Sequence, residues 1–284
     1  MKTILQSIPL SLSLLCLLPV TGFAAPGSLI DDNALRSSFQ KGLESLYNAK
    51  KTTALKELNL QLDRAITNVK IPKAAGIKLP PGKFYNHCKP SVFMVGRLYK
   101  CNKCTKWHVS SASGFAINSS GVIATNYHVV DNNDGATMGA MDHTGKTYAV
   151  AEVLAANKAD DVALLQLRDA RLTPLPLANK APVGSAVNVI SHPDGRYFTM
   201  TRGDVSRYFL SRSKGGGKAE RMAITADYAK GSSGAPVIDN TGAVVGMVSS
   251  TSSIYYNQTG GKKENLQMVI KSCVPVEAIR RLLR

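Results

Sequence analysis

The spacing of apolar residues divides the chain near residue 85. Between residues 31 and 69 they recur at intervals of three and four, which is the period of an amphipathic helix. A polar break at residues 48–53 interrupts this pattern, so we expect two packed helices. Residues 70–83 are rich in Pro, Gly and Lys and are typical of a linker. The helical part would serve either as a packing or spacer element or as a segment that regulates or docks a partner.

After residue 85 the chain consists of short apolar runs separated by polar turns. Closely spaced runs without helical patterns between them favour antiparallel barrels or sandwiches over a parallel α/β sheet. Gly-containing turns at 118–121 and 240–242 predict hairpins. A final helix is expected at 276–283, with Pro275 at its start. The expected strands are 91–98, 113–117, 122–125, 148–154, 162–167, 186–191, 197–210, 222–226, 235–238, 243–249 and 266–270.

The first 24 residues have the pattern of a secretory signal peptide. Lys2 precedes an apolar run at 8–20, and residues 22–24 include the small side chains that signal peptidase requires. The run is short for a bilayer span, and no later segment is more apolar, so we expect no transmembrane segment after signal removal; an uncleaved anchor is the alternative. The expected organisation is a signal peptide (1–24), a helical extension with linker (25–84) and a main domain (85–284). The protein would be periplasmic or secreted.

Charge and composition restrict the partners. The net charge of +16 favours anionic partners such as envelope polymers, although a solvated basic surface is the simpler interpretation. No long run of Lys and Arg and no nucleic-acid motif is present, so we expect no specific nucleic-acid partner.

Four cysteines follow the signal segment, at Cys88, Cys101, Cys104 and Cys273. An even number in an oxidising compartment predicts two disulfides, for which three connectivities exist. We expect Cys101 to pair with Cys104 and Cys88 with Cys273.

A metal site is the competing interpretation of the same cysteines. Cys101 and Cys104 together with His108, and His87 beside Cys88, have a spacing that zinc ligands can use. Free or redox-active thiols are a third possibility. The disulfide interpretation is preferred, so no metal and no cofactor are expected.

The stretch from Thr225 to Pro236 contains the sequence Gly231-Ser-Ser-Gly ahead of an apolar run. Gly231 permits a turn that a side chain would block. The backbone N–H groups of Gly231 and Ser233 could then converge as an oxyanion hole. The stretch differs from the Gly-x-Ser-x-Gly elbow of α/β-hydrolases, because Pro236 cannot continue a helix.

A nucleophilic serine needs a base, and the base needs an orienting acid. Among the five histidines, His128 stands at the end of a predicted strand. Asp161 directly precedes a strongly apolar strand, and its neighbour Asp160 is the rival. Each of these residues alone is more often structural than catalytic. Their order, His128, Asp161, Ser233, is nevertheless the His-Asp-Ser order of chymotrypsin.

From about Pro90 onward the chain resembles trypsin-like serine endopeptidases, in particular the bacterial envelope branch that includes the high-temperature-requirement proteases. The resemblance implies two packed six-stranded antiparallel barrels with a catalytic triad in the cleft between them. It also implies hydrolysis of protein or peptide substrates through an acyl-enzyme, with Ser233 as nucleophile, His128 as base and Asp161 as its support; Ser232 is a minor alternative nucleophile. The matching motifs are Ala112-Ser-Gly-Phe-Ala-Ile-Asn, Ala124-Thr-Asn-Tyr-His-Val-Val, Asp161-Val-Ala-Leu-Leu-Gln-Leu, Thr199-Met-Thr-Arg-Gly-Asp-Val-Ser and Gly231-Ser-Ser-Gly-Ala-Pro.

The chain departs from its relatives in two respects that bear on regulation. Digestive members are activated when a new N-terminal ammonium pairs with an Asp before the nucleophile, but Ser232 occupies that position here. We therefore expect no activation of that kind. The envelope branch usually carries a peptide-binding module after the catalytic domain, whereas this chain ends at Arg284, so we do not expect cage formation or peptide sensing.

Specificity is read from the residues around Ser233. Asp227, six residues earlier, stands where the resemblance places the floor of the primary pocket, and a carboxylate there would bind Arg or Lys. Ser249, Ser250 and Thr251 would form the wall of the pocket and offer an edge to an extended substrate. Thr251, however, replaces a glycine that gives long side chains room, so Asp227 could instead be structural.

Two other functional classes compete with an endopeptidase. One is a catalytically silent binding protein on the same fold, which would hold anionic partners. The other is a zinc-dependent or thiol enzyme that uses the cysteines.

Overall fold

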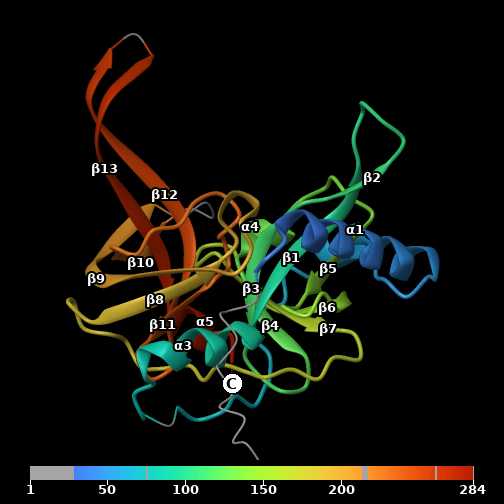
Figure 1. Cartoon of the computed structure of the whole chain (residues 1–284), viewed down its shortest axis with the longest axis horizontal. Helices are drawn as coiled ribbons and strands as arrows, with labels where there is room; N and C mark the ends of the chain where they lie inside the picture. Colours follow the sequence, from blue (N-terminus) through green and yellow to red (C-terminus); the bar gives the residue numbers. More distant parts are fainter. Residues whose placement is uncertain (1–28, 75, 213–216, 260, 284) are drawn as a thin grey trace, which may run out of the picture. The chain divides into compact units, whose positions relative to one another are not determined.

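The apolar runs that follow residue 91 form two antiparallel β-barrels, as predicted (Figure 1). The computed structural model describes residues 29–74, 76–212, 217–259 and 261–283, so the predicted signal peptide at 1–24 lies outside the described residues. The elements discussed below belong to the unit that begins at Asp31. Within the described ranges, no helix combines the length and the apolar character needed to cross a membrane.

The first barrel contains six strands in the order β1-β3-β4-β7-β6-β5, and it closes because β1 also pairs with β5. The short strand β2 adds to the edge of β1. Alternate residues of β1 enter different apolar clusters: Phe93 belongs to the cluster that contains Leu165, and Met94 to the one that contains Ile190 of the second barrel. Both faces are therefore buried. The strands are β1 (Val92–Lys100), β2 (Trp107–Val109), β3 (Ala112–Ala116), β4 (Val122–Thr125), β5 (Thr137–Met141), β6 (Thr147–Asn157) and β7 (Val162–Leu167).

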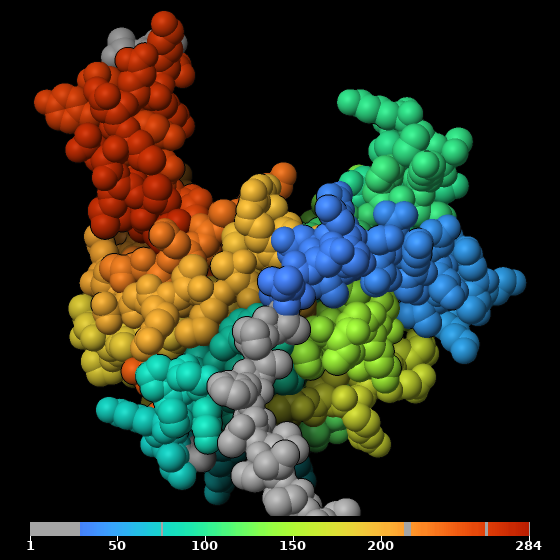
Figure 2. All heavy atoms as spheres, viewed as in Figure 1, coloured from blue at the N-terminus to red at the C-terminus, as the bar shows by residue number. Residues whose placement is uncertain are grey.

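The second barrel closes in the order β10-β13-β12-β11-β8-β9. Strands β12 and β13 are longer than expected, and their outer half stands clear of the barrel as a two-stranded ribbon (Figures 1 and 2). Ser, Thr, Asn and Gln dominate residues 249–259, so the apolar alternation that reveals a strand is missing there. The strands are β8 (Ala186–Ser191), β9 (Thr199–Arg212), β10 (Lys218–Ile224), β11 (Pro236–Asp239), β12 (Val244–Thr259) and β13 (Lys262–Pro275).

The N-terminal extension packs on the first barrel. Its first helix, α1 (Asp32–Asn48), begins where the Asp31 side chain accepts a hydrogen bond from the Ala34 N–H (2.9 Å). Phe39 and Leu43 of α1 are fully buried. At Gly139 of β5 a Cβ would lie 2.7 Å from the Leu43 side chain, so this glycine lets α1 approach the barrel closely. The extension therefore contributes to the core.

The remaining helices are short. The second predicted helix is reduced to α2 (Leu55–Asn59), although Leu55 and Leu58 are buried as its pattern requires. An unpredicted helix, α3 (Pro81–Cys88), begins inside the expected linker with proline in its first turn. The C-terminal helix α5 (Val276–Arg280) ends three residues earlier than expected. The others are η1 (Lys89–Ser91), α4 (Tyr127–Val130) and η2 (Pro193–Gly195).

The cysteines are not paired as expected. All four are free thiols. Cys88 and Cys273 are buried in different apolar clusters, and burial raises the pKa of each thiol to about 12. The predicted Cys88–Cys273 disulfide is therefore wrong. Cys101 and Cys104 lie close together, with their sulfur atoms 3.4 Å apart.

Candidate active site

His128 is presented by the single turn of helix α4, directly after strand β4. Its backbone N–H donates to Oδ1 of Asp161 (3.1 Å), and its Nδ1 lies 2.9 Å and 3.0 Å from the two carboxylate oxygens. An ionised carboxylate can only accept hydrogen bonds, so Nδ1 carries the proton and Nε2 of a neutral ring is the free acceptor. The ring is about one-third exposed.

Asp161 is held by three neighbours just before strand β7. Its backbone has φ +64°, a left-handed conformation that is uncommon for a residue with a side chain, and Asn126 donates to its carbonyl oxygen (3.0 Å). Ser249 Oγ donates to Oδ2 (2.7 Å). Burial by itself raises the pKa of this carboxyl, but hydrogen bonds from His128 and Ser249 outweigh burial and lower it below its ordinary value. The carboxylate is thus ionised at neutral pH.

Asp160, the rival acid, has a different partner. Its Oδ2 lies 2.9 Å from the guanidinium of Arg281, beyond helix α5. Its backbone N–H donates to the side chain of Asn157 (2.9 Å). Asp161 is therefore the carboxylate that faces the imidazole.

Ser233 lies on the loop between β10 and β11 and belongs to the second barrel. Its hydroxyl donates to the carbonyl oxygen of Ser249 (3.2 Å), and no hydrogen bond joins it to His128 among the described residues. Ser249 thus contacts both ends of the site, Asp161 through its hydroxyl and Ser233 through its carbonyl. Catalytic hydrogen bonds are often absent from unliganded sites and form when substrate binds.

The backbone around Ser233 exposes two N–H groups. The carbonyl oxygen of Lys230, which precedes Gly231, accepts a hydrogen bond from the Asp194 N–H (2.6 Å). The carbonyl oxygen of Ser232, which precedes Ser233, accepts one from the Ala235 N–H (3.0 Å). A trans peptide unit is planar, with its N–H opposite its carbonyl oxygen. The N–H groups of Gly231 and Ser233 therefore point away from these contacts, and within the described residues neither donates a hydrogen bond.

Ser113 of strand β3 holds this loop from the first barrel. Its N–H donates to the carbonyl oxygen of Ser233 (2.8 Å), and its hydroxyl donates to that of Gly231 (3.0 Å). Our sequence reasoning missed Ser113 and Asn126 as parts of the site. Both are fully buried polar residues in apolar surroundings, and such residues need hydrogen-bond partners, which is the signal that could have identified them.

A cavity of about 210 Å³ opens beside Ser233. The Tyr228 side chain is nearly buried, and its hydroxyl lies within hydrogen-bond distance of the carbonyl oxygens of Ser250 (3.0 Å) and Ser272 (2.8 Å). An aromatic ring thus fills space next to the cavity. The lining consists of Tyr228, Ala229, Lys230, Ser233, Val248, Ser249, Ser250 and Thr251.

Of the four predicted substrate-binding residues, Ser249, Ser250 and Thr251 line this cavity and Asp227 does not. The Asp227 side chain is 83% exposed and pairs with Lys271 Nζ (3.1 Å). It lines a separate surface hollow formed by β10 and β13. The same Nζ donates to the carbonyl oxygen of Tyr228 (2.8 Å), so Asp227 is joined to a structural lysine.

The backbone of His192 lies against the loop that carries Gly231 and Ser233. A Cβ on Gly231, which has φ +95°, would lie 2.5 Å from the His192 carbonyl oxygen, so only glycine fits there. The His192 ring is fully buried between the edges of Tyr197 and Phe198, and its Nδ1 accepts a hydrogen bond from the Phe198 N–H (3.0 Å). Burial lowers its pKa to about 4.

This buried imidazole predicts a loss of stability in mild acid. The unfolded chain binds the proton with an ordinary pKa of 6.5, so it takes up a proton more readily than the folded chain. The free energy of unfolding should therefore fall as the pH drops below 6.5 and go on falling towards 4, by about 3 kcal/mol in total. Urea denaturation at pH 7 and pH 4.5 measures the change. His192→Asn, which keeps an acceptor for Phe198 and does not titrate, should show a clearly smaller drop; an equal drop in both proteins contradicts the assignment.

Two barrels, with a His-Asp pair on one and a serine loop on the other, define the chymotrypsin-like class of fold. Residues 112–247 match the family model of the trypsin-like peptidase domain. The solved structure of the Rv3671c protease from M. tuberculosis in its active form is 22% identical, with a TM-score of 0.55 over 78% of this chain and 92% of that chain. The likeness supports the fold.

Curated relatives are similar over a comparable region. A probable periplasmic serine endoprotease DegP-like from Brucella suis is 29% identical over 193 residues, which cover 65% of this chain and 36% of that protein. The anti-sigma-I factor RsgI9 from Acetivibrio thermocellus is 32% identical over 177 residues, 61% of this chain and 23% of that protein. The chain thus spans about a third or less of the length of these relatives. Residues 112–247 thus match the trypsin-like peptidase domain, and the chain is similar to DegP-like serine proteases, as its motifs predicted.

Proposed function

We propose that this protein is an exported serine endopeptidase, periplasmic or secreted, in which Ser233, His128 and Asp161 act together through an acyl-enzyme. The observation that carries the proposal is the chain of contacts from His128 through Asp161 and Ser249 to Ser233. Beside it lie the backbone N–H groups of Gly231 and Ser233, which donate no hydrogen bond within the described residues. The family and the DegP-like relatives favour protein or peptide substrates.

In the proposed mechanism each group has its own step. Nε2 of His128 takes the proton from Ser233 as Oγ attacks the scissile carbonyl carbon, and Asp161 stabilises the imidazolium that forms. The negative charge on the carbonyl oxygen is met by the N–H groups of Gly231 and Ser233; one such donor is worth about 2.7–4 kcal/mol. His128 then protonates the leaving amine. Water attacks the ester by the same route and frees the enzyme.

Substrate binding would itself prepare the nucleophile. Strand β11 pairs with β12 only as far as Met247, and beyond Val248 that edge of β12 is open to an extended peptide. A substrate N–H that binds the Ser249 carbonyl would replace the bond from Ser233 (3.2 Å). The released hydroxyl needs only a rotation about one side-chain bond to change partner.

The cavity beside Ser233 predicts a preference for small, uncharged side chains before the cleaved bond. Among the described residues no carboxylate lines it, Lys230 lies at its wall, and the Tyr228 ring occupies the adjacent space. Reporter peptides with Ala or Val at that position should be cleaved with kcat/KM at least about tenfold above otherwise identical peptides with Arg or Lys, because a buried unpaired cation costs more than about 1.4 kcal/mol. Faster cleavage after Arg or Lys would restore Asp227 as the specificity residue.

The alternative is a silent binding protein that holds anionic partners on its basic surface. Binding alone does not require a carboxylate-held imidazole beside an accessible serine. A fluorophosphonate probe separates the two functions: we expect one adduct per chain, mapped by peptide mass spectrometry to Ser233. A folded protein that takes up no probe would favour the binding protein.

A further inference from the structure

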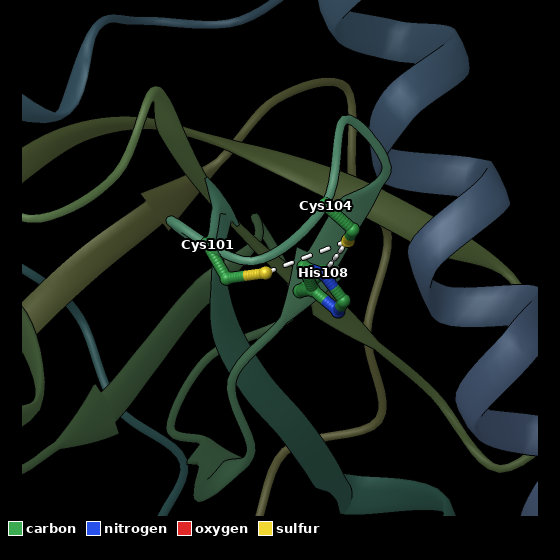
Figure 3. Close-up of side chains that lie close together, drawn as sticks. All are labelled: Cys101, Cys104 and His108. Atoms are coloured by element: carbon green, nitrogen blue, oxygen red, sulfur yellow. Dashed lines mark hydrogen bonds between the residues drawn. The ribbon is translucent and has the colours of Figure 1, made fainter.

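The hairpin between β1 and β2 brings three metal-binding side chains together outside the proposed active site (Figure 3). Cys101 follows β1, Cys104 lies in the turn, and His108 is part of β2. In Figure 3 the three side chains point toward one another. We propose that Cys101, Cys104 and His108 bind one Zn²⁺ ion, with the fourth coordination position open to water or to another ligand.

The interatomic distances suit zinc. The sulfur atoms of Cys101 and Cys104 are 3.4 Å apart, Cys104 Sγ is 3.1 Å from His108 Nε2, and all three ligand atoms lie within 4.8 Å of one another. Around a tetrahedral Zn²⁺ the corresponding separations are about 3.8 Å and about 3.6 Å, from Zn–S bonds of about 2.3 Å and Zn–N bonds of about 2.0–2.1 Å. Shifts of about 0.5 Å would admit the ion. A disulfide requires an S–S distance of about 2.05 Å, a larger change.

The strands fix two of the ligands. Tyr99 and His108 are partners in the β1–β2 ladder, and the Tyr99 ring lies against the imidazole with 5.6 Å between ring centres. The neighbouring Trp107 packs edge-on against Tyr47 of α1 (5.3 Å). The base of the hairpin is thus anchored, and Cys101 directly follows a paired residue, Lys100.

The charge of the filled site suits this chain, because cysteine binds metal as the thiolate. Lysines stand beside the ligands at positions 100, 103 and 106. Two thiolates then neutralise a divalent cation, so the filled site adds no net charge to a strongly basic chain.

A filled site would stabilise a hairpin that reaches the proposed active site. Arg97 and Tyr99 of β1 and Ser110 after β2 line a hollow of about 390 Å³ whose other walls include Lys230 and Gly231. The metal would therefore stabilise one wall of the surface next to the proposed oxyanion hole. Because the folded hairpin already holds the three ligands together, it should bind the metal more tightly than the unfolded chain does, and the melting temperature should rise.

Zinc titration of the reduced full chain tests the proposal. Isothermal titration calorimetry with zinc chloride should show one ion per chain. Cys101→Ser, Cys104→Ser and His108→Ala should each weaken binding by at least about tenfold, since each removes one of three ligands. His87→Ala, which removes an exposed histidine outside the cluster, should leave the affinity unchanged, and circular dichroism checks that each variant is folded.

Three results would overturn the proposal. The first is the absence of stoichiometric binding to the reduced, folded chain. The second is binding that the Cys101 and His108 variants leave intact. The third is a Cys101–Cys104 disulfide, detected as a loss of two hydrogens by mass spectrometry, that persists in glutathione with excess zinc. None of these readouts uses peptidase activity, so they stand apart from the proposed function.

Discussion

Replacing Ser233 by alanine is expected to lower kcat by about 10⁶-fold, the size of loss that follows removal of a serine nucleophile from such a unit. Within the part of the chain that the structure describes, the hydroxyl makes one weak hydrogen bond, to the Ser249 carbonyl (3.2 Å), so the free energy of unfolding should change by less than about 1 kcal/mol. Activity would be measured on a reporter peptide with Ala or Val before the cleaved bond, and stability by urea denaturation.

Ser232→Ala is the matched control for Ser233→Ala. The Ser232 side chain is fully buried and its hydroxyl donates to Ser191 Oγ (3.0 Å), so it is directed away from solvent. Removing it should cost about 1 kcal/mol of stability while kcat stays within about tenfold. A loss of activity that follows Ser232 rather than Ser233 would reverse the assignment of the nucleophile.

Asp161→Asn should lower kcat by about 10⁴-fold through the tautomer of His128. Oδ1 accepts the His128 backbone N–H (3.1 Å), and an asparagine must keep an oxygen there. Its NH₂ group then takes the place of Oδ2 and donates to Nδ1 of the ring. The ring proton moves to Nε2, which can no longer accept the proton of Ser233. The same reporter assay measures the loss, with circular dichroism as the check on folding.

Asp160→Asn is the neighbouring control. Its carboxylate pairs with Arg281 at 2.9 Å and touches no residue of the proposed triad. We therefore expect kcat to stay within about tenfold. The free energy of unfolding should fall by about 1 kcal/mol, because the ion pair with Arg281 is lost. If Asp160→Asn lowered kcat more than Asp161→Asn, the supporting acid would have to be reassigned.

Strands were predictable from sequence where burial dictates the pattern. The runs at β7 and β8 have the predicted bounds because nearly all of their side chains are buried. Strand β5 escaped prediction, since Gly139 weakens its pattern and the reason for the glycine is the close approach of Leu43 from α1. The outer part of the β12–β13 ribbon also escaped prediction. Its strands pair with each other without burying one face, so no apolar alternation marks them.

Within the candidate site, residue types were easier to predict than contacts. The order of His128, Asp161 and Ser233 pointed to a triad, and the structure places the first two in contact. Nothing in the sequence indicates that the Asp227 side chain turns away to Lys271, because five loop residues lie between it and Ser233. The hydroxyl contact of Ser249 with Asp161 joins residues 88 positions apart and depends on how the barrels pack.

Helix α1 sets the N-terminal limit of any fragment of this protein that can fold. Phe39 and Leu43 share an apolar cluster with Met94 and Phe115, so a fragment without the helix would expose an apolar patch to water. A fragment trimmed to the segment that matches the family, residues 112–247, would also lack β1 and β13 and leave both barrels with open seams. The unit that folds thus begins at least as early as Asp31, well before the segment that matches the family model.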